Sequence, residues 1–210
     1  MDLRVVEHFD SIQGEGLHAG VPAVFLRLAG CNLACPYCDT LHSWDTEGKR
    51  LTHEMAVAIL HKRAMAVITG GEPLLQKEAV MALSDAARVG GTRVHLETNG
   101  TIRLTAKEVK SFDWITVSPK SMDTVEDAVI FADEIKILCG DGAFTADQVV
   151  AVVRLVRMVP WCVPVVVQPL EVSDVEQTKA NMKATVQVVR DINDASVRVG
   201  VQLHKMMDWR

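Results

Sequence analysis

Short apolar segments alternate along the chain with segments in which apolar residues recur every three or four positions. The first kind is rich in Val, Ile and Leu and has the length of buried strands, whereas the second has the period of amphipathic helices. The predicted strands cover residues 21–28, 65–69, 93–97, 114–118, 134–138, 163–168 and 197–203. The predicted helices cover residues 52–64, 77–89, 145–159 and 173–192.

Three of these helices begin with a capping signal. Thr52 is a plausible N-cap, and Thr145 with Gln148 and Ser173 with Glu176 have the spacing of a capping box. The strand–helix alternation favours a mostly parallel sheet with covering helices. Since no linker, repeat or low-complexity stretch interrupts it, we expect a single domain over residues 1–210.

Polar residues follow most of the predicted strands, at corresponding positions. They are Thr69 with Gly70, Gly71 and Glu72; Glu97 with Thr98 and Asn99; Ser118 with Lys120; Gln168; and His204. Turns favour such residues for local reasons, but a repeated set favours a shared active-site mouth, as in barrel-like α/β folds. A full eightfold barrel typically needs about 200 residues or more. We therefore predict a partial, TIM-like α/β barrel with fewer helices than strands.

Composition narrows the class of protein. The net charge of −5 argues against a large nucleic-acid surface, which needs clustered Lys and Arg. No apolar run approaches the roughly 20 residues that cross a bilayer, and no secretory signal is evident, so we expect a cytoplasmic protein without a membrane partner. Thiols in that compartment stay reduced, so the five cysteines suggest metal or redox chemistry rather than disulfides.

Three of the cysteines, Cys31, Cys35 and Cys38, fall within eight residues. Thiolates suit iron–sulfur clusters or zinc. Three ligands on a four-iron cluster leave one iron open, as a catalytic centre requires. The alternative is a structural zinc loop with His42 or a distant cysteine as fourth ligand, although Cys139 and Cys162 lie in apolar surroundings and are expected to be buried.

Two motifs together resemble the radical S-adenosylmethionine superfamily. The first is the Cys-x3-Cys-x2-Cys spacing with Tyr37 before the last cysteine, and the second is Gly70-Gly71-Glu72-Pro73 after a strand. The resemblance implies a [4Fe-4S] cluster on Cys31, Cys35 and Cys38, with S-adenosylmethionine bound to its open iron. Glycine lets the backbone approach such a ligand closely.

Narrower motifs resemble the 7-carboxy-7-deazaguanine synthase family over nearly the whole chain. They are residues 11–16, 22–30, 38–40, 97–100 and 117–120, with Gln168-Pro169 and His204-Lys205. That family converts 6-carboxy-5,6,7,8-tetrahydropterin to 7-carboxy-7-deazaguanine with loss of ammonia, on the route to queuosine and other 7-deazapurines. It uses a regenerated 5′-deoxyadenosyl radical, with assistance from magnesium. The resemblance also implies a homodimer and an electron donor such as flavodoxin or ferredoxin.

The resemblance assigns roles residue by residue, with no catalytic side chain beyond the radical itself. Cys31, Cys35 and Cys38 would hold the cluster, and Thr40 would bind Mg²⁺, a hard ion that prefers oxygen. The S-adenosylmethionine site would comprise Tyr37, Cys38, Asp39, Gly71, Glu72, Ser118, Pro119, Lys120 and Gln168. The pterin would contact Ile12, Gln13, Gly14, Glu15, Arg27, Thr69 and His204.

The role assigned to Arg27 has independent physical support, because this residue interrupts an apolar strand. A buried guanidinium is costly unless it is paired. The substrate carboxylate would be a bidentate partner for the guanidinium. A structural ion pair, for instance with Glu15, or a position on a solvent-facing edge would explain Arg27 without a functional role.

Two other functions remain open at this point. An activase for a glycyl-radical enzyme would share the cysteine motif but needs a groove for a protein loop, and a zinc-stabilised binding module would need no catalysis. The C-terminal residues Met206 to Arg210 depart from the family's usual ending, and Leu203 stands where Thr is expected, so the resemblance assigns Arg210 no role.

Overall fold

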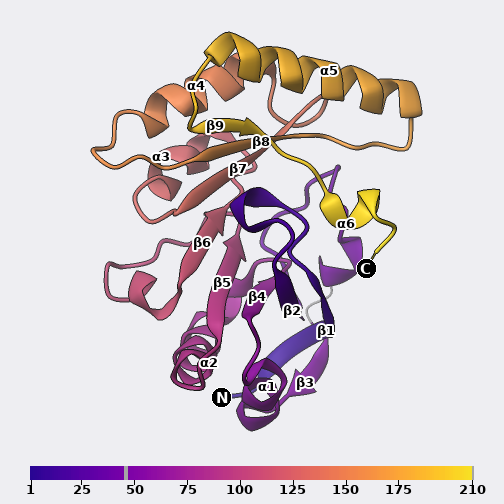
Figure 1. Ribbon diagram of the computed structural model, residues 1–210. Helices are drawn as coiled ribbons and strands as arrows, with labels where there is room; N and C mark the ends of the chain where they lie inside the picture. The colour runs from indigo at the N-terminus through magenta and orange to yellow at the C-terminus, as the bar shows by residue number, and fades with distance from the viewer. Residues whose placement is uncertain (45–46, 210) are drawn as a thin grey trace.

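Figure 1 shows the computed structural model, which describes residues 1–44 and 47–209. The strands are β1 (Leu3–Ile12), β2 (Pro22–Leu28), β3 (Lys49–Leu51), β4 (Met65–Gly70), β5 (Arg93–Thr98), β6 (Trp114–Val117), β7 (Glu134–Cys139), β8 (Val165–Pro169) and β9 (Val197–Val199). The helices are α1 (His53–Leu60), α2 (Lys77–Val89), α3 (Val125–Ala128), α4 (Ala146–Val156), α5 (Val175–Ile192) and α6 (Leu203–Met206). Short 3₁₀ turns are η1 (Gly16–His18), η2 (Leu41–Trp44), η3 (Pro73–Gln76), η4 (Val109–Ser111) and η5 (Met122–Thr124).

The described strands form one curved sheet in the order β3-β1-β2-β4-β5-β6-β7-β8-β9. From β2 to β9 all neighbours are parallel, whereas β1 runs antiparallel to β2 and β3 antiparallel to β1. Within the described ranges β3 and β9 do not pair with each other, so the barrel stays open. This confirms the predicted partial TIM-like α/β fold. In the same ranges no helix is long and apolar enough to cross a bilayer.

The main hydrophobic core lies between the sheet and the helices on its outer face (Figure 1). Period-two alternation sends one set of strand residues outward into this core, for example Ile135 and Ile137 of β7. The alternate residues face the inside of the barrel. Toward the C-terminal strand ends these inner positions carry polar side chains: Arg27, Thr69, Glu97, Thr116, Lys136 and Gln168.

The helix starts follow from the sequence, with one correction. Thr52 accepts a hydrogen bond from the Met55 backbone, and Thr145 with Gln148 forms a complete capping box. The α5 helix is capped by Asp174, whose carboxylate accepts from the backbones of Glu176 and Gln177, and not by Ser173 as predicted. An ionised carboxylate is a strong acceptor for these N–H groups and suits the positive end of the helix dipole.

Aromatic rings fill the inside of the barrel below the polar positions. His18 of η1 packs edge-on against His95 and Trp114, with ring centroids 4.5 Å apart in both pairs. His95 is 2% exposed, and neither of its ring nitrogens has a hydrogen-bond partner among the described residues. Burial, reinforced by the charges of His18 and Arg93, lowers the pKa of His95 to about 3, so the ring is neutral at physiological pH.

Candidate functional site

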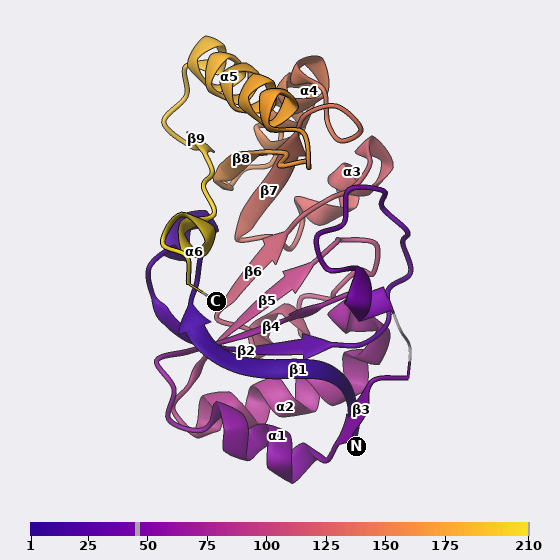
Figure 2. The ribbon, with the colours of Figure 1, turned by 90° about the vertical axis from the view of Figure 1, so that its right-hand side faces the viewer.

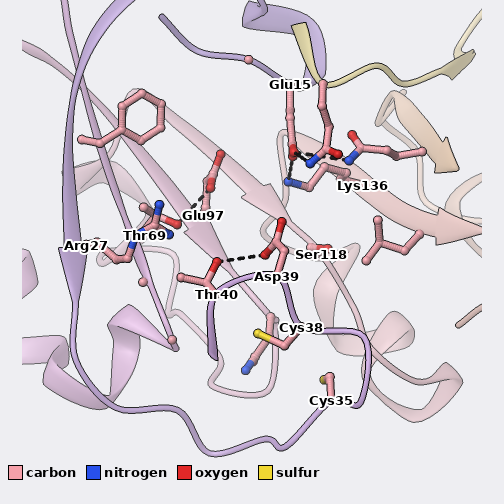
Figure 3. A pocket seen from close by; sticks show the side chains of 18 of the residues that line it. Glu15, Arg27, Cys35, Cys38, Asp39, Thr40, Thr69, Glu97, Ser118 and Lys136 are labelled. Atoms are coloured by element: carbon pink, nitrogen blue, oxygen red, sulfur yellow. Dashed lines mark hydrogen bonds and ion pairs between the residues drawn. The ribbon is translucent and has the colours of Figure 1, made fainter. Parts of the chain in front are cut away.

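One cavity of about 370 Å³ opens at the C-terminal ends of the parallel strands, inside the barrel (Figure 3). Its wall contains all the residues predicted for the cluster, the magnesium ion and the pterin, and most of those predicted for S-adenosylmethionine. Of the predicted set, only Glu72 and Pro119 do not line it. The predicted site residues therefore converge on one space, although they come from segments far apart in the sequence.

The cysteine loop follows β2 and borders this cavity. Cys31, Cys35 and Cys38 are half-buried, and none is in a disulfide. Protein contacts shape the loop: the Gly30 backbone donates to the Ser43 carbonyl at 2.8 Å, and the Cys38 backbone donates to the Cys35 carbonyl at 3.1 Å. Partly exposed thiols from one short loop, facing a common cavity, fit the ligand set of an iron–sulfur cluster.

A single-ion zinc site has less support. Across residues 1–44 and 47–209, no group of three His, Cys, Asp or Glu side chains is close enough to hold one metal ion. The proposed fourth ligands lie elsewhere: Cys139 is buried in the core, and the His42 imidazole lies 3.7 Å from the Glu7 carboxylate. Cys162 is exposed, so its predicted burial is wrong; it lies in the connection between α4 and β8.

The Gly70-Gly71-Glu72 segment packs directly under the cysteine loop. A β-carbon at Gly71 would lie 2.2 Å from the Gly30 carbonyl oxygen, so only glycine allows this approach. The Glu72 carboxylate is fully buried and accepts hydrogen bonds from Thr98 Oγ1 at 2.8 Å and from the backbones of Asn99 and Leu74 at 2.7 and 2.9 Å. Glu72 thus ties the end of β4 to the end of β5.

Ser118, Lys120 and Gln168 form the wall on the far side of the barrel. Lys120 donates to Ser118 Oγ at 2.8 Å, and burial together with the charge of Lys136 lowers the pKa of the Lys120 ammonium. The buried Gln168 donates to Glu15 at 3.3 Å, but its own Oε1 has no partner among the described residues. An unpaired buried acceptor costs free energy, so this oxygen fits a hydroxyl or amine donor of a bound cofactor.

Arg27 projects from β2 into the opposite end of the cavity (Figure 3). Its Nε donates to Glu7 Oε1 at 3.0 Å, and its guanidinium lies 5.9 Å from the centroid of the Phe9 ring. The predicted ion pair exists, but the partner is Glu7 and not Glu15. A guanidinium that is engaged through Nε still has Nη1 and Nη2 as donors, and a substrate carboxylate could accept from them.

The β1–β2 connection carries the remaining polar groups. Gln13 donates to Glu97 Oε1 at 3.0 Å, and Thr69 donates to Glu97 Oε2 at 3.0 Å. Glu15 pairs with Lys136 and accepts from Gln202 at 2.7 Å. Burial raises the pKa of Glu15, but the charge and hydrogen bond of Lys136 and the amide donors outweigh it and hold that pKa at about 2.

The C-terminal segment closes the side of the barrel next to β1 (Figure 2). The Leu203 backbone donates to the Gly14 carbonyl at 2.8 Å, and a β-carbon at Gly14 would lie 1.8 Å from His204 Nδ1. His204 and Lys205 therefore reach the cavity wall. Arg210 lies outside the described residues.

Sequence reasoning missed four polar residues of the site: Glu7, Lys136, Glu171 and Gln202. Lys136 had a usable signal, since it interrupts an apolar strand between Ile135 and Ile137 as Arg27 interrupts another. Glu7 gave none, because the alternation of β1 is obscured by charged residues on both faces.

Comparisons with known proteins agree with this geometry. The profile of the Radical SAM superfamily matches residues 26–179, and the chain belongs to that superfamily. The Nitratidesulfovibrio vulgaris protein named 7-carboxy-7-deazaguanine synthase is 38% identical over 162 residues, which cover 66% of this chain and 71% of the relative. Within the superfamily, the chain belongs to the 7-carboxy-7-deazaguanine synthase family.

Other relatives carry the same name. The Hyperthermus butylicus protein is 47% identical over 124 residues, which cover 57% of this chain and 53% of the relative. The chain thus spans about half the length of this relative. The crystal structure of QueE from Escherichia coli superposes with a TM-score of 0.76 and 25% identity, covering 97% of this chain and 95% of the other.

Proposed function

We propose that this protein converts 6-carboxy-5,6,7,8-tetrahydropterin to 7-carboxy-7-deazaguanine with release of ammonia. The observation that carries the proposal is that one cavity is lined by the three cysteines on one side and by Arg27, Gln13 and Glu97 on the other. The first set suits a cluster, and the second suits a small heterocycle that bears a carboxylate. The curated relatives named for this activity support it.

The roles of the site residues follow as part of the proposal. Cys31, Cys35 and Cys38 would hold a [4Fe-4S] cluster, and the chemistry that this group would supply is one-electron reduction of bound S-adenosylmethionine. Tyr37, Asp39, Gly71, Ser118, Lys120 and Gln168 hold the rest of the cofactor, and Glu72 supports Gly71 from below. Pro119 lies outside the cavity wall and fixes the backbone between Ser118 and Lys120.

The pterin occupies the other half of the cavity. Arg27 binds its carboxylate, while Gln13, Glu15 and the backbone of Ile12 and Gly14 contact the ring, with Thr69 and His204 beside it. Thr40, whose hydroxyl donates to Asp39 Oδ1 at 2.9 Å, provides an oxygen ligand for Mg²⁺. The protein's part in the reaction is to hold the reacting groups in contact and keep water out.

Further parts of the proposal concern the setting of the enzyme. We infer a cytoplasmic homodimer that receives electrons from a flavodoxin or ferredoxin. Gel filtration with light scattering tests the dimer, and reduction by purified flavodoxin tests the donor.

Anaerobic reconstitution followed by turnover tests the central claim. We expect about four iron and four sulfide per chain and formation of 7-carboxy-7-deazaguanine from the carboxylated tetrahydropterin. Deuterium at the abstracted position of the substrate should appear in 5′-deoxyadenosine. One zinc per chain and no turnover would instead indicate a binding module, and radical transfer to a protein loop without pterin turnover would indicate an activase.

A further inference from the structure

Two charged residues on the inner face of β7, Glu134 and Lys136, lie against the β1–β2 connection. More than 100 residues of sequence separate this connection from β7. Glu134 is 1% exposed, and its Oε2 accepts a hydrogen bond from the Leu17 backbone at 2.7 Å. Gly16 has φ +69°, and a β-carbon there would lie 2.2 Å from Glu134 Oε1. The backbone of the connection, at Gly16 and Leu17, therefore packs directly against the Glu134 carboxylate.

Lys136 engages the same connection through a side chain. Its ammonium pairs with Glu15, and both side chains are largely buried, at 13% and 15% exposure. Burial alone would lower the pKa of Lys136, but Glu15, Glu97 and Glu134 outweigh it and raise that pKa. The ammonium thus remains charged, and the Glu15 carboxylate remains an acceptor at the edge of the cavity (Figure 3).

A buried ion pair of this kind is a weak source of stability, since a well-packed apolar pair of similar volume is often as stable or more so. What the pair does supply is a fixed position and a fixed charge for one carboxylate. Gln202 and Gln168 occupy the other oxygen of Glu15, at 2.7 and 3.3 Å, so the carboxylate is held from three different segments of the chain.

We propose that Lys136 is a positioning residue for the substrate half of the cavity: together with Glu134 it fixes residues 13–17, and through its ion pair it orients Glu15 toward the ring of the bound heterocycle. This inference rests on the proposed function, because it takes the carboxylated tetrahydropterin as the molecule that Glu15 meets. In this arrangement Glu15 accepts hydrogen bonds from the N–H groups of the ring, and Lys136 itself does not touch the substrate.

The test is a double-mutant cycle on the anaerobically reconstituted enzyme, with Lys136→Met, Glu15→Gln and the combination. Lys136→Met should raise the KM for the carboxylated tetrahydropterin about tenfold or more, with a smaller change in kcat. Reductive cleavage of S-adenosylmethionine without pterin should fall by a smaller factor than kcat/KM for the pterin, because Lys136 reaches the cofactor wall only indirectly, through Glu15 and Gln168 and through its charge near Lys120. Since Lys136 acts through Glu15, the double variant should be no worse than Glu15→Gln alone.

Three further variants separate positioning from general support of the fold. Lys136→Arg keeps the charge and should recover most of the KM, whereas Lys179→Met removes a lysine from an exposed ion pair on α5 and should match the parent protein. Gly16→Ala pushes a β-carbon onto Glu134 without altering Lys136 and should also raise the KM. It keeps the proposal testable if Lys136→Met does not fold.

The outcomes are distinct. An unchanged KM in Lys136→Met or Gly16→Ala, or effects of Lys136→Met and Glu15→Gln that multiply in the double variant, would overturn the inference. Equal loss of cofactor cleavage and of pterin turnover would also overturn it, because that pattern indicates a collapsed barrel. If the parent protein and Lys179→Met both fail to turn over the pterin, it is the proposed function that is wrong.

Discussion

Replacing His95 by phenylalanine should make the stability of the fold less sensitive to mild acid. In the folded protein His95 stays neutral until the pH reaches its pKa of about 3, whereas in the unfolded chain it protonates near the usual histidine pKa of 6.5. The folded-state pKa is depressed, so acid favours the unfolded state from pH 6.5 downward, and the loss continues until the pH reaches about 3. Phenylalanine keeps the ring contacts with His18 and Trp114 and removes the titration.

The size of the effect follows from the two pKa values. Between pH 7.5 and 5 the unfolded histidine gains its proton and the folded one does not, which lowers the free energy of unfolding by about 2 kcal/mol. The urea m-value is about 2 kcal/mol per molar. Between pH 7.5 and 5, the urea midpoint of the parent protein should therefore fall by about 1 M more than the midpoint of His95→Phe. Any overpacking by the larger ring does not depend on pH and leaves the slope unchanged.

Urea unfolding followed by circular dichroism measures this difference, on cluster-free reduced protein so that loss of the cluster does not contribute. His8→Phe, at an exposed position of β1, should retain the slope of the parent protein. If the parent and His95→Phe curves run parallel from pH 7.5 to 5, His95 does accept a proton in the fold and the reasoning from its burial is refuted.

Three other substitutions test single features. Arg27→Lys keeps the charge but loses the two terminal guanidinium nitrogens and the Nε contact with Glu7. The KM for the carboxylated pterin, measured by steady-state kinetics, should therefore rise about 10- to 100-fold. An unchanged KM would show that Arg27 does not bind the carboxylate. Glu72→Gln sets an amide N–H₂ against N–H donors and should cost about 2 kcal/mol in thermal unfolding; an unchanged Tm would contradict the buried network. Thr145→Ala should lower the free energy of unfolding by about 1 kcal/mol through loss of the α4 cap, whereas Thr145→Ser keeps the cap and should not. Urea midpoints measure the difference, and equal midpoints for the two variants would argue against the cap.

The sequence alone predicts the parallel part of the fold well, because its strands are continuous apolar segments and its helices carry capping residues. The α2 helix begins and ends as predicted, while α1 stops at Leu60 and not at residue 64. The strand β1 was not predicted, since it is antiparallel near the sheet edge and mixes Glu7, His8 and Asp10 with apolar residues. The last predicted strand, 197–203, is divided between β9 and the start of α6.

The candidate site is predictable where a local motif or an interrupted apolar strand marks it. Spacing alone indicates Cys31, Cys35 and Cys38, and a charge in an apolar strand indicates Arg27. Pairing is not predictable in this way, because the partner of Arg27 depends on the register of β1 against β2, which places Glu7 opposite Arg27. Likewise, only the fold shows that Glu72 turns away from the cavity toward Asn99.

Side-chain hydrogen bonds hold the cysteine loop against the end of β5. Asn99 Nδ2 donates to Asn32 Oδ1 at 3.0 Å, and Asn32 Nδ2 donates to Thr101 Oγ1 at 2.8 Å, so the loop is anchored to the end of β5 by amides and hydroxyls that are not metal ligands. These contacts fix the position of the loop without involving the thiols of Cys31, Cys35 or Cys38, so substitution of a cysteine should leave that position intact.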